Sequence, residues 1–448
     1  MTQSLAQLVA WFRHSSPFIH AHRDRTFVVG FDGEALIDAE AADALVHDLA
    51  LLSGLGIRLV LVPGARPQVD ERLARAGIEP RRANGLRITD ATAMDGVRDA
   101  VGAVRLQLEA LFSMGLANSP MAGLRLQVAS GNFVTARPLG VLEGVDYAYT
   151  GTVRRVDADA LRQRLDDRAV VIVSPLGVSP TGELFNLHAG DVAVAVARSL
   201  QADKLLFLHE GDGLVDGEGH RRGELTLDEA RGLLASAEAE AMPEMIRQQL
   251  ARAVAACRGG VPRVHLLPRR QDGAMLGELF TRDGVGTLVA ARPFEQLRTA
   301  GTGDIPGILA LIRPLEADGV LVARTRERLE TEIDDFLVME REGTIVACAA
   351  LHGIDGGDGS PSGGEIACLV VHPEYRHSRR GEQLLEKLET QARARGWRQL
   401  FVLTTQASHW FVERGYQPTD PEALPPARRA DYQPDRASRV LAKALTPD

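Results

Sequence analysis

Residues 372–392 join an apolar segment to a helical stretch through a turn that is rich in arginine. The turn contains Arg376, Arg379 and Arg380, and Gly381 stands where the helical pattern begins. The first turn of a helix has unpaired backbone N–H groups and the positive end of the helix dipole, which together attract a phosphate group. Basic helix starts are also common on solvated surfaces. The spacing alone therefore leaves two interpretations, a solvated turn and an anion site.

Basic charge in this chain comes almost entirely from arginine. Of the 51 basic residues only Lys204, Lys387 and Lys443 are lysine, so the first 203 residues contain none. The forked donors of arginine pair with carboxylates in two-point fashion, which suits an acidic metabolite. Since 48 arginines are present, solvated surface is the ordinary interpretation for any single one.

The composition indicates a soluble globular protein of two or three domains, because 448 residues exceed one ordinary core. A net charge of −9 argues against a nucleic-acid surface and favours small metabolites as partners. No apolar run reaches transmembrane length, and the N-terminus lacks the pattern of a signal peptide. Cys257, Cys348 and Cys368 have no paired spacing, so we expect no disulfide and no metal site, in a reducing cytoplasm.

Short apolar runs alternate with helical stretches over residues 1–291. After an opening helix over Ser4–His14, the runs TFVVGF, IRLVLVP, AVVIVSP, KLLFLHE and RVHLLP are separated by helical patterns. This alternation is typical of β-α-β units. It predicts one large α/β domain, an open and mostly parallel sheet between two layers of helices.

A short linker over residues 292–295 leads to a second module over residues 296–448. Helices over 304–318 and 326–335 precede a meander of the strands FLVMERE, TIVACAALH and EIACLVVHP, followed by a helix and further strands. The Gly/Ser-rich stretch over residues 353–364 predicts a flexible hairpin tip. The second module is therefore also α/β.

The second module resembles the GNAT acetyltransferases in its order of elements, in VVHPEYR before the turn and in WFVERGY near the fifth strand. In that family the turn reads Arg/Gln-x-x-Gly-x-Gly/Ala and holds the pyrophosphate of acetyl-CoA. Arg376 and Gly381 match this pattern, and Arg379 replaces its first glycine. The resemblance implies a mixed, splayed sheet whose fourth strand pairs with the pantetheine arm. The implied acetyl-CoA ligands are Leu369, Val370, Val371, Arg376, His377, Ser378, Arg379, Arg380 and Gly381.

Amine acetylation needs a base for the ammonium group and an acid for the leaving thiolate. By the same resemblance the base is Glu365, at the start of the fourth strand, although an exposed strand-edge carboxylate fits that position too. The tyrosine acid of many GNAT enzymes is replaced by Phe411, which leaves Thr404 as the acid or as an ordinary strand residue. The expected acceptor is L-glutamate, held by Arg324, Cys368, Arg436 and Ser438.

The first module resembles the amino-acid kinase fold, and specifically N-acetylglutamate kinase, in VPGARPQVDERL, GLRITDATAM and SPTGELFNLHAGD. Kinase chemistry in that family requires two lysines and an ordering aspartate around the migrating phosphate. The first lysine position carries Gly30, the second falls near Gln249, and Asp32 would repel a phosphate. The ordering aspartate falls on Gly190, or on Asp191 after a one-place slip. An inactive kinase domain is expected.

The stretch HLLPRRQDGAMLGELFTRDGVGTLV resembles the effector segment of arginine-sensitive acetylglutamate kinases. The residues implied to contact L-arginine are His265, Glu278 and Gly284. A carboxylate with backbone carbonyls suits a guanidinium group, and a surface helix with a glycine turn is the alternative. In those kinases an N-terminal helix joins six subunits in a ring. The apolar stripe here is Leu5, Leu8, Val9 and Phe12, which could equally pack on its own domain.

An inactive acetylglutamate kinase joined to a GNAT module is the layout of the bacterial N-acetylglutamate synthase family, which the chain resembles over nearly its full length. The resemblance implies acetyl transfer from acetyl-CoA to L-glutamate, opening arginine biosynthesis, with L-arginine as feedback inhibitor of a homo-oligomer, as a hexamer. Neither nucleic acid nor a membrane is an expected partner. Two alternatives stay open, a bifunctional synthase and kinase, and an amino-acid sensor whose GNAT module acetylates proteins.

Overall fold

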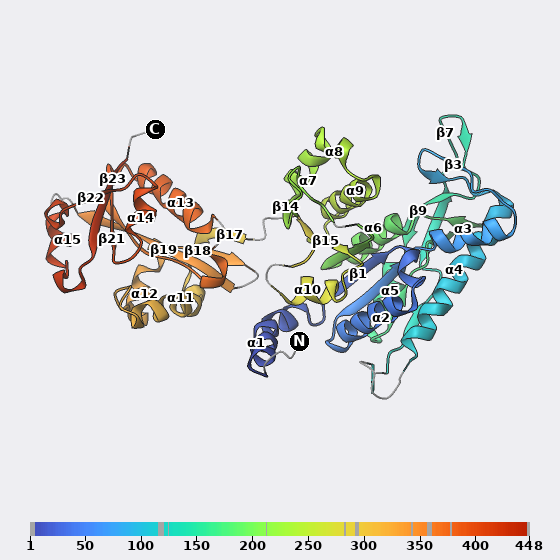
Figure 1. Cartoon of the computed structure of the whole chain (residues 1–448), viewed down its shortest axis with the longest axis horizontal. Coiled ribbons are helices and arrows are strands. Elements are labelled where there is room, and N and C mark those ends of the chain that lie inside the picture. The colour runs from blue at the N-terminus through green and yellow to red at the C-terminus, as the bar shows by residue number, and fades with distance from the viewer. Residues whose placement is uncertain are drawn as a thin grey trace. The chain divides into compact units, whose positions relative to one another are not determined.

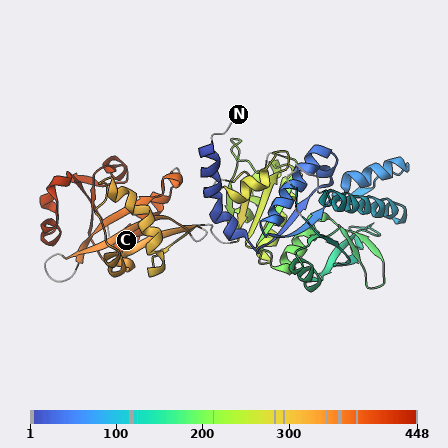
Figure 2. The same cartoon turned by 90° about the horizontal axis from the view of Figure 1, so that it is seen from below.

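The computed structural model describes residues 5–114, 121–123, 125–211, 213–281, 284–291, 295–341, 344–355, 361–376 and 379–445. Two compact units make up the chain, Met1–Arg292 and Pro293–Asp448. Figures 1 and 2 show both units from two directions, the first in blue to yellow and the second in yellow to red. None of the helices among the described residues is long and apolar enough to cross a membrane.

The first unit is built on an eight-stranded sheet whose neighbouring strands are parallel, except for the antiparallel pair β15–β16. Every residue of β1 and of β13 is buried, because helices cover both faces of the sheet. The expected apolar runs form its central strands. In spatial order the strands are β14 (Glu224–Thr226), β16 (Thr287–Ala290), β15 (Arg263–Pro268), β13 (Lys204–His209), β1 (Thr26–Phe31), β2 (Arg58–Pro63), β10 (Val170–Ile172) and β5 (Val128–Ser130).

Helices cover both faces of this sheet and form two separate apolar cores with it. One face carries α5 (Ala158–Asp166), α6 (Ala189–Leu200), α7 (Leu227–Leu234) and α9 (Glu244–Arg258). The other carries α2 (Ala39–Gly54), α3 (Arg66–Arg75), α4 (Ala91–Phe112) and α10 (Ala274–Phe280). The short helix α8 spans Glu238–Ala241. The expected three-layer αβα sandwich is confirmed.

Smaller strands lie beside this sandwich. A four-stranded sheet has the order β12 (Leu184–Asn186), β11 (Leu176–Val178), β6 (Val134–Pro138) and β9 (Gly151–Val156). Two hairpins are β3 (Arg82–Ala83) with β4 (Leu86–Arg87), and β7 (Val141–Leu142) with β8 (Val145–Asp146). The β3–β4 hairpin places Arg82 opposite Arg87.

The first helix, α1, spans Leu5–His22 and is longer than the Ser4–His14 helix expected from the sequence. Its second half packs on the first unit, where the Ser15 hydroxyl donates to the carbonyl of Phe280 at 3.3 Å. Three residues of the apolar stripe at its start, Leu5, Val9 and Phe12, are instead exposed. The second half of the helix therefore packs on its own domain, while these three apolar side chains stay exposed to solvent.

The second unit is a mixed seven-stranded sheet with helices on both faces, as the resemblance implied. In spatial order its strands are β17 (Glu295–Thr299), β18 (Phe336–Arg341), β19 (Thr344–Asp355), β20 (Pro361–Val371), β21 (Gln399–Thr404), β23 (Arg439–Ala444) and β22 (Gln417–Thr419). Only the pair β20–β21 is parallel. In Figure 1 one face carries α11 (Ile305–Ala317) and α12 (Arg326–Glu332), and the other α13 (Arg380–Ala394) and α14 (Ser408–Val412). Helix α15 spans Pro426–Ala430.

The strands of this hairpin extend further into the glycine-rich stretch over 353–364 than the sequence indicated, and the predicted tip itself falls on residues outside the described part. Strand β19 continues to Asp355 and β20 begins at Pro361, while residues 356–360 lie outside the described part. Gly364 pairs with Gly353 on one side and with Leu400 on the other. A Cβ atom at Gly364 would lie 2.3 Å from the indole of Trp397. Glycine is required there because the indole packs directly against the strand.

Candidate active site and effector cluster

The central strands of the second unit part from one another halfway along their length. Strands β20 and β21 are paired from Gly363 to Ile366, and beyond that β21 continues its pairing with β23 alone. Where they part, β20 contains a bulge against β19, and Cys368 adopts a positive φ of 49°. A bulge bends its strand and re-aims the local backbone. The β21-facing edge of residues 369–371 is therefore open to an extended ligand.

The arginine turn leads into the N-terminus of α13. Among the described residues, Arg379 at the N-cap position makes no side-chain hydrogen bond to the first-turn N–H groups of this helix. Gly381 lies there beside the ring of Trp410, and a Cβ atom at this glycine would be 3.3 Å from Cζ2 of that ring. The exposed Arg379 is paired with Glu382 at 2.8 Å, and Arg376 donates to the carbonyl of Val371 at 3.4 Å. This arrangement fits a diphosphate.

Not every predicted ligand of the turn is seen to be available to a phosphate group. The Arg380 guanidinium binds Glu295 through contacts of 2.8 and 2.9 Å and the carbonyl of Tyr375 at 3.1 Å, with its side chain 14% exposed. The positive charge of Arg380 is thus paired with the carboxylate of Glu295, the first residue of β17. The predicted ligands His377 and Ser378 lie outside the described residues.

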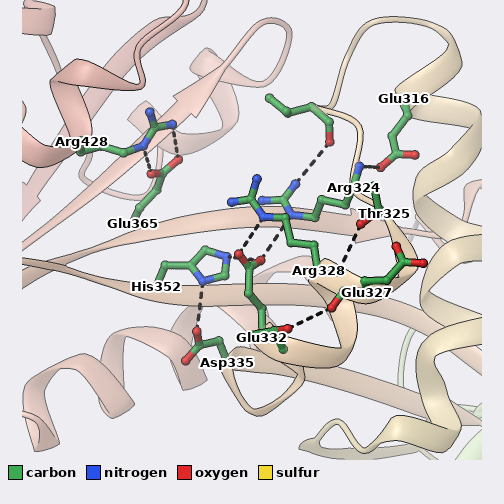
Figure 3. A network of polar contacts seen from close by, with 12 residues as sticks. Glu316, Arg324, Thr325, Glu327, Arg328, Glu332, Asp335, His352, Glu365 and Arg428 are labelled. Carbon is green, nitrogen blue, oxygen red and sulfur yellow. Dashed lines mark hydrogen bonds and ion pairs between the residues drawn. The ribbon is translucent and has the colours of Figure 1, made fainter.

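Glu365 lies in the middle of β20, one residue before its pairing with β21 ends, rather than at the start of the strand. Its side chain is only 12% exposed, which does not fit a free surface carboxylate. Arg428 on α15 donates to both of its oxygens, through Nη2 to Oε1 at 3.1 Å and through Nε to Oε2. This hydrogen-bonded carboxylate raises the pKa of Arg428. Figure 3 shows the pair, and His352 stands opposite Glu365 in register.

Thr404 is the last residue of β21 and is partly buried. Its hydroxyl oxygen accepts from the backbone N–H of Ala407 at 2.9 Å and of Gln406 at 3.3 Å. A hydroxyl group has one donor and two acceptor positions, so its proton stays free for another acceptor. Glu365 on β20 and Thr404 on β21 thus lie on either side of the point where the two strands separate.

Two of the predicted acceptor ligands, Arg324 and Arg436, lie at the loop between α11 and α12. The Arg324 side chain, 10% exposed, donates to the carbonyl of Val322 at 3.4 Å. Arg436 donates to the carbonyls of Gly319 and Val320 at 3.0 and 3.1 Å. The Ser438 carbonyl accepts from the hydroxyl of Tyr432 at 3.0 Å. These residues come from distant parts of the sequence.

The fourth predicted ligand, Cys368, is buried at the bulge. Burial raises the pKa of its thiol to about 11, and the positive charge of Arg324 acts against this rise. Cys368 is therefore a thiol at neutral pH and lies within electrostatic reach of Arg324.

Five polar residues that the sequence analysis missed lie around Arg324 and Glu365, namely Glu332, Arg328, His352, Asp335 and Arg428. Glu332 binds Arg328 at 2.7 Å, and its Oε2 lies 3.9 Å from both Arg324 Nε and His352 Nε2. The other ring nitrogen of His352 binds Asp335 at 3.1 Å (Figure 3). Arg428 completes the set. No spacing in the sequence distinguishes it from the other arginines.

The three predicted effector residues come together in the first unit. His265 on β15 binds Glu278 on α10 at 2.7 Å, and Gly284 lies so close that a Cβ atom there would be 2.5 Å from Glu278 Oε2. Burial alone would raise the pKa of Glu278, but hydrogen bonds from His265 and from the backbone lower it to about 2. Burial and the nearby Lys204 lower the pKa of His265. The cluster therefore presents an ionised carboxylate.

A separate cavity of about 570 Å³ lies in the first unit. Its wall includes the altered positions of the kinase pattern, Gly30, Asp32, Gly190 and Gln249, and also Asp191, the alternative place for the ordering aspartate. A Cβ atom at Gly30 would lie 3.1 Å from the ring of Phe207, so no longer side chain fits there without movement. Burial and the charge of Glu34 raise the pKa of Asp32.

Positive charge around this cavity comes from arginines that the sequence analysis did not place there, Arg66, Arg82, Arg87 and Arg252. Arg82 and Arg87 share the carboxylate of Asp70, and Arg252 binds Asp191 at 2.8 Å. Most of this charge is thus directed at protein carboxylates. Among the described residues no three His, Cys, Asp or Glu side chains are grouped so as to hold a metal ion.

Comparison with known proteins covers both units. Residues 25–268 match the amino acid kinase family, and residues 310–416 match the acetyltransferase (GNAT) family. The chain is 52% identical to the amino-acid acetyltransferase of Azotobacter vinelandii over 437 residues, 98% of this chain and 99% of the relative. It is likewise 52% identical to that of Pseudomonas fluorescens over 441 residues, 98% of this chain and 100% of the relative.

Solved structures extend the comparison. A Neisseria gonorrhoeae N-acetylglutamate synthase complexed with coenzyme A and L-arginine is 41% identical, with a TM-score of 0.88, and covers 98% of this chain and 99% of its own. The same synthase complexed with coenzyme A and N-acetyl-glutamate gives a TM-score of 0.61 over the same coverage.

Proposed function

This chain belongs to the amino-acid acetyltransferase family, and we propose that it transfers the acetyl group of acetyl-CoA to the amino group of L-glutamate, the first step of arginine biosynthesis. The observation that carries the proposal is the parting of β20 and β21, with Glu365 on one strand and Thr404 on the other. Similarity over the full chain to a synthase solved with coenzyme A, and with N-acetyl-glutamate, supports the choice of both substrates.

The protein would hold acetyl-CoA through backbone groups along one continuous path. The start of α13, where the N-cap residue Arg379 makes no side-chain cap hydrogen bond and Arg376 lies nearby, suits the diphosphate. The open edge of residues 369–371 suits the amide-bearing pantetheine arm, which would lie there as an added strand. Arg380 would contribute through its backbone, because Glu295 binds its side chain.

Glu365 would accept one proton from the ammonium group of L-glutamate, leaving the electron pair on nitrogen. That nitrogen then bonds to the acetyl carbon, the carbon–sulfur bond breaks, and its electron pair leaves on sulfur. Thr404, whose hydroxyl proton has no acceptor among the described contacts, would donate to the departing sulfur. The amine's second proton replaces the one that Thr404 gives. Arg324, Arg436, Ser438 and Cys368 would orient the acceptor.

Residues 1–291 would form a regulatory domain without kinase activity, and residues 296–448 the catalytic domain. L-Arginine would bind at His265, Glu278 and Gly284. Three protein donors occupy the Glu278 carboxylate, which has about four acceptor positions, so a guanidinium would take the remaining one or displace a donor. Feedback inhibition would be a coupling free energy between this cluster and the acetyl-transfer site.

We further propose a homo-oligomer, as a hexamer, located in the cytoplasm. The exposed Leu5, Val9 and Phe12 of α1 support the first part, because they leave an apolar stripe available to another subunit. The three cysteines, all free and buried, suit the second.

The test is thiol release from acetyl-CoA with a panel of free amino acids, with and without L-arginine. We expect L-glutamate to be preferred and L-arginine to slow its turnover. A Glu365→Gln protein should lose about a hundredfold or more in kcat, as expected for removal of a general base. Glu330→Gln, at an exposed carboxylate of α12, is the control. The assignment would be refuted by a preference for aspartate or ornithine, or by acetyl groups appearing on protein lysines instead of L-glutamate. It would also be refuted if Glu365→Gln had the kcat of the wild type.

A further inference from the structure

The general base of the proposed reaction is held by a cation. Both oxygens of Glu365 accept hydrogen bonds from Arg428, and the two side chains are only 12% and 23% exposed. Figure 3 shows the guanidinium fork facing the carboxylate edge. The two residues are 63 positions apart in the sequence and come from β20 and α15. The pair is therefore a tertiary contact of the folded site.

This contact opposes the role proposed for Glu365. A carboxylate that accepts both hydrogen bonds of a guanidinium fork is stabilised in its charged form, and a proton arriving there would break the ion pair. Simply withdrawing Arg428 would leave two partly buried charges without partners, which is costly. The base can act only if Arg428 receives another anion as it leaves Glu365.

The neighbouring arginines are bound in a different way. Arg436 donates to two backbone carbonyls, and Arg324 donates to one at 3.4 Å, with the carboxylate of Glu332 no nearer than 3.9 Å. These two guanidinium groups can receive an acceptor carboxylate without displacing a strong ion pair. Arg428 is the one whose partner is the base, so its occupation by a ligand changes the chemistry of the site.

We propose that Arg428 is a latch on the base that a carboxylate of the acceptor releases. This proposal rests on the function proposed above. The side-chain carboxylate of L-glutamate takes the Arg428 guanidinium, and Glu365, now free, takes a proton from the acceptor's ammonium group. One ion pair replaces another, so Arg428 stays paired throughout, and the amine nitrogen keeps its electron pair for attack. An amino acid with a neutral side chain cannot make the exchange. Arg428 is thus a positioning residue that also determines specificity.

The test compares L-glutamate with L-glutamine, which has the same length and a neutral side chain, using the full chain and acetyl-CoA. In Arg428→Met we expect the KM for L-glutamate to rise about tenfold to a hundredfold, the size of one charge-assisted contact. The fall in kcat should be smaller, since the base is no longer latched. The ratio of kcat/KM between the two acceptors should fall at least about tenfold.

Arg428→Lys keeps the charge but loses the fork, and we expect an intermediate ratio. It also serves as the test if Arg428→Met does not fold. Arg429→Met, at the exposed neighbour on α15, should match the wild type. An unchanged ratio in both Arg428 variants would overturn the latch, as would a loss of kcat at constant KM. A wild-type protein that does not acetylate L-glutamate would instead refute the proposed function.

Discussion

Replacing Gly364 by alanine perturbs the strand that carries the proposed base. Gly364 lies next to Glu365 in β20 and is buried between β19 and β21. The added methyl group would lie 2.3 Å from Trp397 Cζ3 and 2.6 Å from Cε3, and 3.0 Å from the carbonyl oxygen of His352. Trp397 is itself 7% exposed, so its ring has little room to move.

The expected cost follows from these distances. Ordinary Cβ contacts begin near 3.4 Å, so the indole or the strand must shift by roughly 1 Å. Overpacking of a dense core costs about 1–3 kcal/mol, while alanine regains up to about 1 kcal/mol by restricting the unfolded chain. The net loss of unfolding free energy is then about 1–2 kcal/mol. For a unit of this size it corresponds to a fall in Tm of about 2–8 °C.

The assay is thermal unfolding of the full chain followed by tryptophan fluorescence. Two of the three tryptophans, Trp397 and Trp410, belong to the second unit, so they report on its unfolding. The control is Gly303→Ala, where a Cβ atom would meet nothing within 4 Å, and we expect no loss of stability. The reasoning is refuted if Gly364→Ala melts with the wild type, or if the control loses as much.

Three further predictions concern the two units separately. Glu278→Gln should lower the unfolding free energy by up to about 3 kcal/mol at pH 7, since a folded pKa of about 2 against an ordinary 4.5 favours the folded state. Because the folded pKa of Glu278 is depressed, this stability difference is present above pH 4.5 and shrinks as the pH falls toward 2. The measurement is the melting temperature of wild type and variant by circular dichroism. A difference between the two proteins that widens on acidification would contradict the prediction. Arg379→Met should raise the KM for acetyl-CoA about two- to fivefold in low salt and leave kcat little changed. The effect is small because the charge of Arg379 is exposed and screened by solvent and salt. The control Lys387→Met, at an exposed lysine of α13, should change neither constant. In a coupled assay with ATP and N-acetylglutamate, neither the wild type nor Gly30→Lys should release ADP. The variant should not regain the activity because Phe207 occupies the space that a lysine side chain would need. ADP release by either protein would argue for a bifunctional enzyme.

The central strands were predictable from the sequence because their signal is local. A strand buried on both faces is mostly apolar. TFVVGF and KLLFLH are such runs, with polar residues only at their ends, and every residue of both is buried in the sheet. The candidate site was less predictable, since its residues were placed through family resemblance rather than spacing. Glu365, for example, was expected at the start of a strand and lies within it.

Features that depend on distant residues could not be predicted. The glycines before Glu365 indicate a turn by local rules, yet Gly364 is explained by Trp397, which no local rule connects to it. Arg428 is one of 48 arginines, and only the folded chain brings it to Glu365. The positive φ of Cys368 is likewise unsuited to a cysteine in isolation, and arises where β20 bulges against β19.

The order of strands in the second unit constrains how this half of the protein is assembled during synthesis. Strand β23 follows every other strand of its sheet along the chain, yet it inserts between β21 and β22 and pairs with all six residues of β21. Until residues 439–444 have been made, β21 has an unprotected edge and β22 lacks the neighbour it pairs with here. The first unit is made before these residues and can fold earlier, whereas the second unit keeps an unpaired strand edge exposed until they are made.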